Sequence, residues 1–98
     1  MWRHGDVLIQ ACKKIPDSAQ LLPHLILARG EITGHAHRIR ERDGVELFHA
    51  GDEMFLRVSA KIATIIHEEH APIELSQGIY RVWIQREYTP KEIRRVLD

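Results

Sequence analysis

The chain has 98 residues and carries 14 basic and 14 acidic side chains, so its formal net charge is zero. This length predicts one domain over residues 1–98, and the balanced charge argues against a nucleic-acid-binding protein, which needs a basic surplus. No apolar run reaches the roughly 18–20 residues of a membrane span. The single cysteine, Cys12, cannot form an internal disulfide, which favours a cytoplasmic location.

Strand signals dominate the chain as far as residue 88. Alternating or β-branched segments, separated by glycine and proline breaks, indicate extended structure rather than helix. The predicted strands are residues 7–12, 24–29, 33–41, 45–50, 54–59, 62–67 and 79–88, with a brief extended piece at residues 73–75. Turns are expected at residues 51–52 and 77–78.

The dipeptide formed by Asp43 and Gly44 is the strongest local turn signal. It lies between two alternating segments, and Asp-Gly is typical of a two-residue hairpin turn. It therefore predicts that residues 33–41 pair with residues 45–50.

The C-terminus is the one predicted helix, near residues 90–97. Thr89 and Glu92 have the spacing of a capping box, and Pro90 suits the first helical position. Short strands with frequent turns and no crossover helices predict an all-β fold. We expect a small antiparallel β-barrel or sandwich with this one short helix.

Seven histidines are present, and two of them share one face of a predicted strand. Because alternate residues of a strand face the same way, His35 and His37 lie on the side of Ile39. Arg38 and Arg40 take the other side, which indicates solvent. The two imidazoles are therefore expected to face inward, with Glu41 further along the same row.

A His-x-His pair on one strand is a fragment of a metal site, since neutral imidazoles bind zinc, iron or nickel and need a third ligand. We expect a divalent metal such as zinc, iron, nickel or manganese. The candidate ligands are His35, His37, Glu41, His67 and His70. His4, His24 and His49 are assigned to the surface or to strand edges.

Two other interpretations stay open. Inward histidines can hydrogen-bond backbone groups or a buried water, and residues 67–70 can be a polar loop that closes a strand. Small size and zero net charge also fit a non-enzymatic interaction or accessory module that binds a protein partner and no metal. Metal content of protein purified without a histidine tag separates these readings.

The spacing from His35 through His37 to Glu41 resembles the first motif of the cupin superfamily, in which two histidines and a glutamate bind a divalent metal inside a β-barrel. Residues 75–80 are similar to the turn that opens the second cupin motif. Ser76 and Arg81 stand where that family has proline and histidine. The resemblance implies a small barrel with His35, His37 and Glu41 as ligands.

Three longer segments are similar to a group of short, uncharacterised bacterial proteins. They are residues 27–39, which contain GHAH, residues 65–75, which contain HEEHAPIEL, and residues 80–96. This resemblance covers most of the chain and implies a bacterial cytoplasmic protein without implying an activity.

Apolar side chains lie on both faces of the last predicted strand. Tyr80 and Val82 face one way, and Ile79 and Trp83 face the other, while Phe48 and Phe55 are expected to point away from the core. A chain this short has too few elements to cover both faces, and large apolar patches mark interfaces. We therefore expect a homo-oligomer, most simply a dimer.

Overall fold

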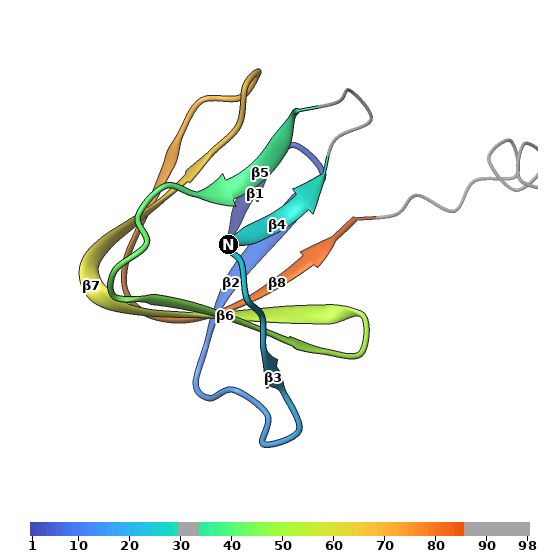
Figure 1. Ribbon diagram of the computed structural model, residues 1–98, viewed down its shortest axis with the longest axis vertical. Helices are drawn as coiled ribbons and strands as arrows, with labels where there is room; N and C mark the ends of the chain where they lie inside the picture. Colours follow the sequence, from blue (N-terminus) through green and yellow to red (C-terminus); the bar gives the residue numbers. More distant parts are fainter. Residues whose placement is uncertain (30–33, 86–98) are drawn as a thin grey trace, which may run out of the picture.

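The computed structural model describes residues 1–29 and 34–85, and within these ranges the chain is all-β (Figure 1). Every strand pairing is antiparallel. The antiparallel all-β class is therefore confirmed. The helix expected near residues 90–97 lies outside the described residues. Within them, no helix is long and apolar enough to cross a membrane.

Eight strands form one sheet. They are β1 (Trp2–His4), β2 (Val7–Cys12), β3 (Gln20–Leu21), β4 (Ile26–Arg29), β5 (Ala36–Ile39), β6 (Val45–Ala50), β7 (Glu53–Ile66) and β8 (Ile73–Ile84). The order is β1-β2-β8-β7-β5-β4, and β6 joins β7 and carries β3 on its other side. The sheet is curled but not closed into a barrel, and the cupin-like form of the prediction is not confirmed.

The expected pairing of residues 33–41 with β6 is wrong. The described part of that segment, β5, pairs with β4 and with the end of β7 at Ile65 and Ile66. β8 occupies one edge of β7, so β6 and β5 follow each other along its second edge. The Gly44 carbonyl accepts hydrogen bonds from the Ser59 and Ala60 amides at 2.8 and 3.1 Å. These bonds hold the Asp-Gly turn against β7, and β6 pairs with β7 rather than with β5.

The long hairpin of β7 and β8 replaces four shorter predicted pieces. The pairing register of the two strands shifts between Val58 and Ile62, so the irregularity read as a strand break is a bulge in one continuous β7. Gln77 and Gly78 lie opposite this bulge inside β8 and form no turn. The turn expected at Gly51 and Asp52 is confirmed, because it joins β6 to β7.

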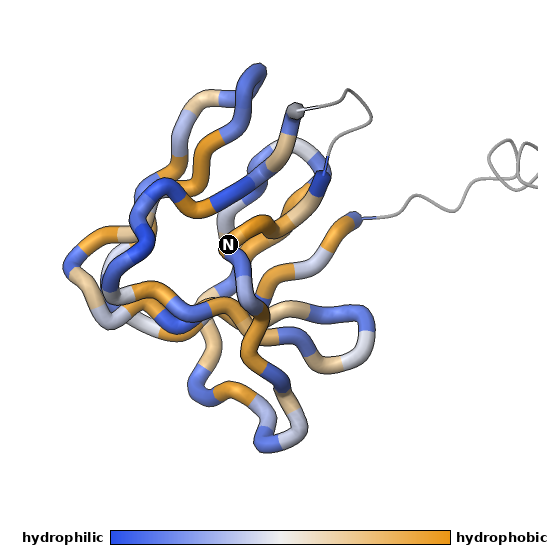
Figure 2. The backbone as a smooth tube through the Cα atoms, viewed as in Figure 1, coloured by the Kyte–Doolittle hydropathy of each residue, from blue (hydrophilic) through white to orange (hydrophobic). Residues whose placement is uncertain are grey.

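The core lies between the curled faces of the sheet, where apolar segments from most of the strands meet (Figure 2). Its fully shielded members include Val7, Ile9, Leu47, Leu56, Leu75 and Val82. Trp2 packs edge-on against Tyr80 at a ring distance of 5.5 Å and closes one side. Phe55 lies outside this core cluster, in keeping with the expectation that it points away from the core, yet only 7% of it is exposed. Its neighbours Phe48 and Arg81 on the flanking strands lie beside it.

Candidate functional site

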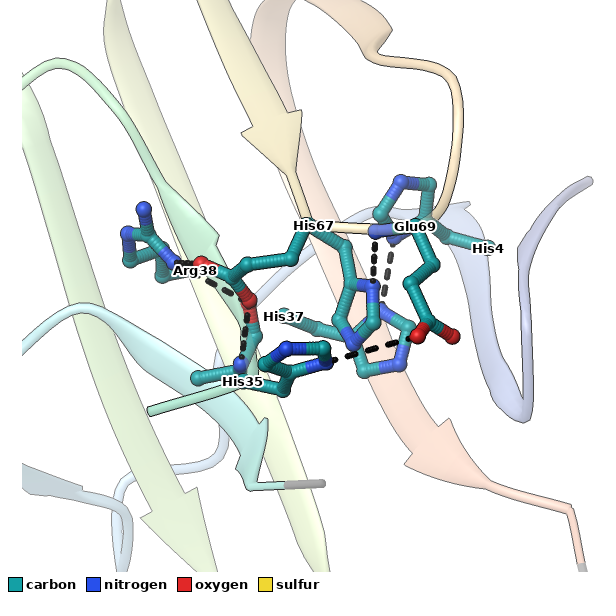
Figure 3. A network of polar contacts seen from close by, with 8 residues as sticks. His4, His35, His37, Arg38, His67 and Glu69 are labelled. Carbon is teal, nitrogen blue, oxygen red and sulfur yellow. Dashed lines mark hydrogen bonds and ion pairs between the residues drawn. The ribbon is translucent and has the colours of Figure 1, made fainter. Parts of the chain in front are cut away.

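Five of the seven histidines gather at one end of the sheet. They come from β1, from β5 and the residue before it, and from the loop between β7 and β8. They are His4, His35, His37, His67 and His70, and neighbouring ring centroids lie 4.3–6.3 Å apart. We call this group the histidine cluster; Figure 3 shows four of its members converging from three elements.

Gly5 makes the close approach of β1 to the cluster possible. It forms the tight turn between β1 and β2 with Asp6, so that His4 pairs with Val7, and its φ is +62°. A Cβ atom at this position would lie 3.0 Å from both His37 Cε1 and His70 Nε2. A larger residue would therefore collide with two imidazoles and also adopt a left-handed conformation that favours glycine.

Glu68 fixes the β7–β8 loop over β5. One of its oxygens accepts a hydrogen bond from the Ala36 amide at 2.9 Å, and the other accepts one from Arg38 Nη1 at 2.7 Å (Figure 3). The hydrogen bond from Arg38 and that from the Ala36 amide lower the pKa of the Glu68 carboxyl to about 2. The carboxylate is thus ionised and held next to His35 and His67.

His4 and His37 share a hydrogen bond between their Nδ1 atoms at 2.7 Å. His4 Nε2 also lies 3.0 Å from the Ala71 carbonyl oxygen, which can only accept. In neutral His4 the proton therefore sits on Nε2, its Nδ1 accepts, and His37 Nδ1–H donates. This order leaves the Nε2 lone pair of His37 free, on the side of Gly5 and His70.

Burial keeps the two inner histidines uncharged. His4 is 2% exposed and His37 is 8% exposed. Loss of hydration lowers the pKa of His4, and it lowers that of His37 to about 4, with further lowering by His67, His4 and His70. Both rings are neutral near pH 7, which is the form that ligates metals.

A three-residue donor group lies on the outer side of the cluster. One ligating atom each from His35, His67 and Glu68 lies within 4.8 Å of the others, and this is the one such group found among the described residues. Atoms bound to one zinc ion lie about 2.0–2.2 Å from it, so the group must contract by up to about 1.4 Å. Glu69 adds negative charge, 3.8 Å from His35 Nδ1.

The structure brings together four of the five predicted ligands. His35, His37, His67 and His70 all belong to the cluster, whereas Glu41 accepts hydrogen bonds from the Thr64 amide and hydroxyl at 2.6 and 2.7 Å. Burial alone raises the pKa of Glu41, but these hydrogen bonds outweigh it and lower the pKa below its ordinary value. Glu41 therefore serves as an anchor between β5 and β7.

His4 and Glu68 were not among the predicted site residues. The sequence places His4 at the surface or at a strand edge; it does lie on the edge strand β1, yet it is the most buried histidine of the cluster. The signal for it was the Gly5-Asp6 pair, which reads as a hairpin turn and then places His4 opposite Val7 on the inner face. His24 and His49 lie outside the cluster, on the chain before β4 and on β6.

Comparison with known proteins identifies a family and no function. A family model described as "Domain of unknown function (DUF8820)" matches residues 3–85, which include the whole histidine cluster. No curated protein and no solved structure matches the chain.

Proposed function

The chain belongs to the DUF8820 family, a domain of unknown function, and we propose from its histidine cluster that it binds one divalent transition-metal ion. The observation that carries the proposal is the donor group of His35, His67 and Glu68, whose ligating atoms lie within 4.8 Å of one another. His37 and His70 are the further donors for the remaining positions, because both rings lie against His67, at 4.3 and 4.8 Å.

The chemistry of the donors favours a first-row ion over magnesium or calcium. Two imidazoles and one carboxylate suit zinc or iron(II), and nickel also accepts imidazole, whereas magnesium and calcium prefer oxygen alone. Glu68 is ionised and His37 is neutral near pH 7, so these donors are already in their ligating forms. A metal alone does not define a reaction, and the proposal is confined to binding.

Binding changes one specific hydrogen bond. The Glu69 amide donates to His67 Nδ1 at 3.0 Å. If the ion takes Nδ1, it displaces this donor; if it takes Nε2, the ring proton moves to Nδ1, which then stops accepting. Either way the Glu69 amide loses its partner, and its NMR resonance reports on metal binding at His67.

The competing proposal is a metal-free polar cluster in an interaction module. It is favoured by the hydrogen bonds already made within the group, because Glu68 and His67 both have partners without an ion. Under this alternative the histidines stabilise the loop and the partner binds elsewhere.

The deciding experiment measures metal in tag-free protein that has never met a nickel resin. Elemental analysis of the purified protein, followed by zinc titration of the chelator-treated protein, is expected to give one ion per chain. His35→Ala, His67→Ala and Glu68→Gln should each weaken zinc binding by about 10-fold or more. His49→Ala is the matched control, since His49 lies outside the cluster, and it should bind zinc as the parent does.

Glu41→Gln separates a loss of stability from a loss of metal binding. Because Glu41 is bonded to Thr64, this variant is expected to keep its metal and to lose stability only. Stoichiometric zinc in the His35→Ala, His37→Ala double variant, or an unmoved Glu69 resonance on titration, would overturn the proposed ligands. Metal-free parent protein that takes up no zinc favours the interaction module.

A further inference from the structure

A second feature lies between β5, β6 and the chain that joins β3 to β4. β5 and β6 follow each other along β7, so the sheet has a gap between them. Residues 22–25 run over this gap, where the Leu22 amide donates to the Leu47 carbonyl at 2.8 Å and the Ile39 amide donates to the Leu25 carbonyl at 2.9 Å. In Figure 1 this segment crosses β6 on its way to β4.

The gap encloses an open cavity of about 580 Å³. That volume is within the range of small-molecule sites, roughly 300–1,000 Å³. Its apolar wall includes the core residues Ile39, Val45 and Leu47, which are 0–7% exposed, and the half-buried Leu22 and Leu25. An alkyl chain or an aromatic ring fits such a wall.

Among the described residues, the charged side chains at the cavity are ion-paired, except for one. Arg38 is paired with Glu68 at 2.7 Å, and Glu46 is paired with Arg57 at 3.0 Å. Among the residues that the structure describes, no hydrogen bond or ion pair engages the Arg42 side chain, which also lines the cavity. One positive charge is therefore left over beside an apolar wall.

His24 adds an unused donor at the same cavity. Its Nδ1 accepts a hydrogen bond from the Ile26 amide at 3.1 Å, so the neutral ring carries its proton on Nε2. The Arg42 guanidinium and the His24 ring N–H can thus both donate to a ligand. A ligand that matches them has an accepting, negatively charged head and an apolar body.

We propose that this cavity binds a small amphipathic carboxylate, with the head at Arg42 and His24 and the apolar body against Leu22, Leu25 and Leu47. The proposal does not require a bound metal. The two sites are nevertheless adjacent, because Arg38 lines the cavity and also holds Glu68.

The test uses the full chain after chelator treatment and three probes of equal chain length: octanoate, 1-octanol and octylammonium. Amide chemical-shift titration is expected to map all contacts to residues 22–26 and 38–47. Octanoate should bind about tenfold more tightly than octylammonium, because one unpaired cation attracts the first and repels the second.

Charge variants identify the head-group site. Arg42→Gln should weaken octanoate binding about threefold to fivefold and leave 1-octanol unchanged, as expected for one partly exposed ion pair. Arg57→Gln should also weaken octanoate, since it frees Glu46 beside the cavity. Lys61→Gln, which removes the same charge away from the cavity, is the matched control and should have no effect.

Two outcomes would overturn the proposal. One is equal affinity for octanoate and octylammonium in the parent protein; the other is probe-induced shifts that fall outside the cavity or are absent altogether. Leu25→Trp, which fills the cavity from a half-buried position, should abolish binding of all three probes. If that variant does not fold, the comparison of Arg42→Gln with Lys61→Gln decides the question alone.

Discussion

The Nδ1 atoms of His4 and His37 lie 2.7 Å apart, and this one hydrogen bond joins the first strand of the sheet to β5. β1 and β5 are not paired with each other, since β2, β8 and β7 lie between them in the sheet order. The two hydrogen bonds of His4, to the Ala71 carbonyl and to His37, therefore cross the open side of the curled sheet. It also fixes which nitrogen of His37 holds the proton.

His4→Phe removes this connection. The Ala71 carbonyl and the His37 Nδ1–H group both lose their partner, and a buried group left without one costs about 1–3 kcal/mol. We expect urea denaturation to show a loss of stability in that range. The ¹⁵N shifts of His37 should also report loss of its single tautomer. His49→Phe, outside the cluster, is the control and should leave the His37 tautomer unchanged; an equally well-defined tautomer in His4→Phe would contradict the hydrogen-bond order.

The metal-free protein should become less stable in mild acid. The pKa of His37 is about 4 when folded, compared with about 6.5 when unfolded, so between these values the unfolded chain binds more protons. Stability from this group is complete above pH 6.5 and is lost as the pH falls toward 4, by at most about 3–4 kcal/mol. The lowered pKa of His4 acts in the same direction.

Denaturation midpoints measured in the presence of chelator at steps from pH 7.5 to 4.5 check this expectation. Glu68 and Glu41 add little above about pH 5, because a carboxyl with a lowered pKa loses its contribution only as the pH falls through the ordinary carboxyl pKa toward the folded value. His37→Gln should flatten the slope between pH 6.5 and 4.5. A parent protein as stable at pH 5 as at pH 7 would show that the buried imidazoles accept protons without cost.

Local sequence patterns predicted the strands better than their partners. Alternation correctly placed Ile39, Leu47, Leu56 and Val58 in the core, because the period of a strand is fixed by the backbone. The pairing of β5 with β7 depends on the length of β7, which continues through a bulge where the sequence indicates a break. A turn signal reports where the chain bends and does not determine which strand it then meets.

The candidate site shows the same difference between local patterns, which the sequence reveals, and contacts between distant segments, which it does not. His35 and His37 were found from alternation on one strand, and His67 and His70 from their spacing. His4 and Ala71 are 67 positions apart in the sequence, so their contact follows only from the curl of the sheet. Glu41 lies two residues beyond the end of β5, and its carboxylate meets Thr64 rather than the histidines.

Gly5→Ala tests whether the cluster depends on the turn between β1 and β2. Gly5 and Gly51 have the same φ of +62°, but a Cβ atom at position 51 meets nothing within 4 Å, whereas one at position 5 meets two imidazoles at 3.0 Å. Both alanine variants pay the same backbone cost, about 1–2 kcal/mol.

The difference between the two variants isolates the steric contact. Gly5→Ala should be less stable than Gly51→Ala by about 1 kcal/mol or more, as overpacking of a tight site costs 1–3 kcal/mol. It should also shift the ring signals of His37 and His70 and, if the metal proposal holds, weaken zinc binding. Equal stability of the two variants would mean that the imidazoles move aside freely.

The outer face of β2 and β8 carries apolar side chains that are only partly shielded. Leu8 and Trp83 are directly paired on this face and half-buried, whereas Ile84, which is 42% exposed, pairs with the core residue Val7 and takes the opposite face. Two arginines cover part of the outer aromatic rings: the Arg81 guanidinium lies 4.4 Å from the ring centre of Trp83, and that of Arg57 lies 5.1 Å from Phe48. Both arginines are also ion-paired, with Glu53 and Glu46.

We expect this face to bury itself in a homodimer. Arginine stems shield apolar rings only in part, and Leu8 lies directly beside Trp83 on the same face. Light scattering should therefore give twice the chain mass of 11.4 kDa. Leu8→Lys should reduce the measured mass to that of a single chain, because a charge in the centre of an apolar interface is desolvated without a partner. Lys61→Glu is the control for added or reversed charge and should stay dimeric. A parent protein of 11.4 kDa whose Trp83 fluorescence resists soluble quenchers would instead mean that Arg57 and Arg81 cover the face well enough for the chain to remain a monomer.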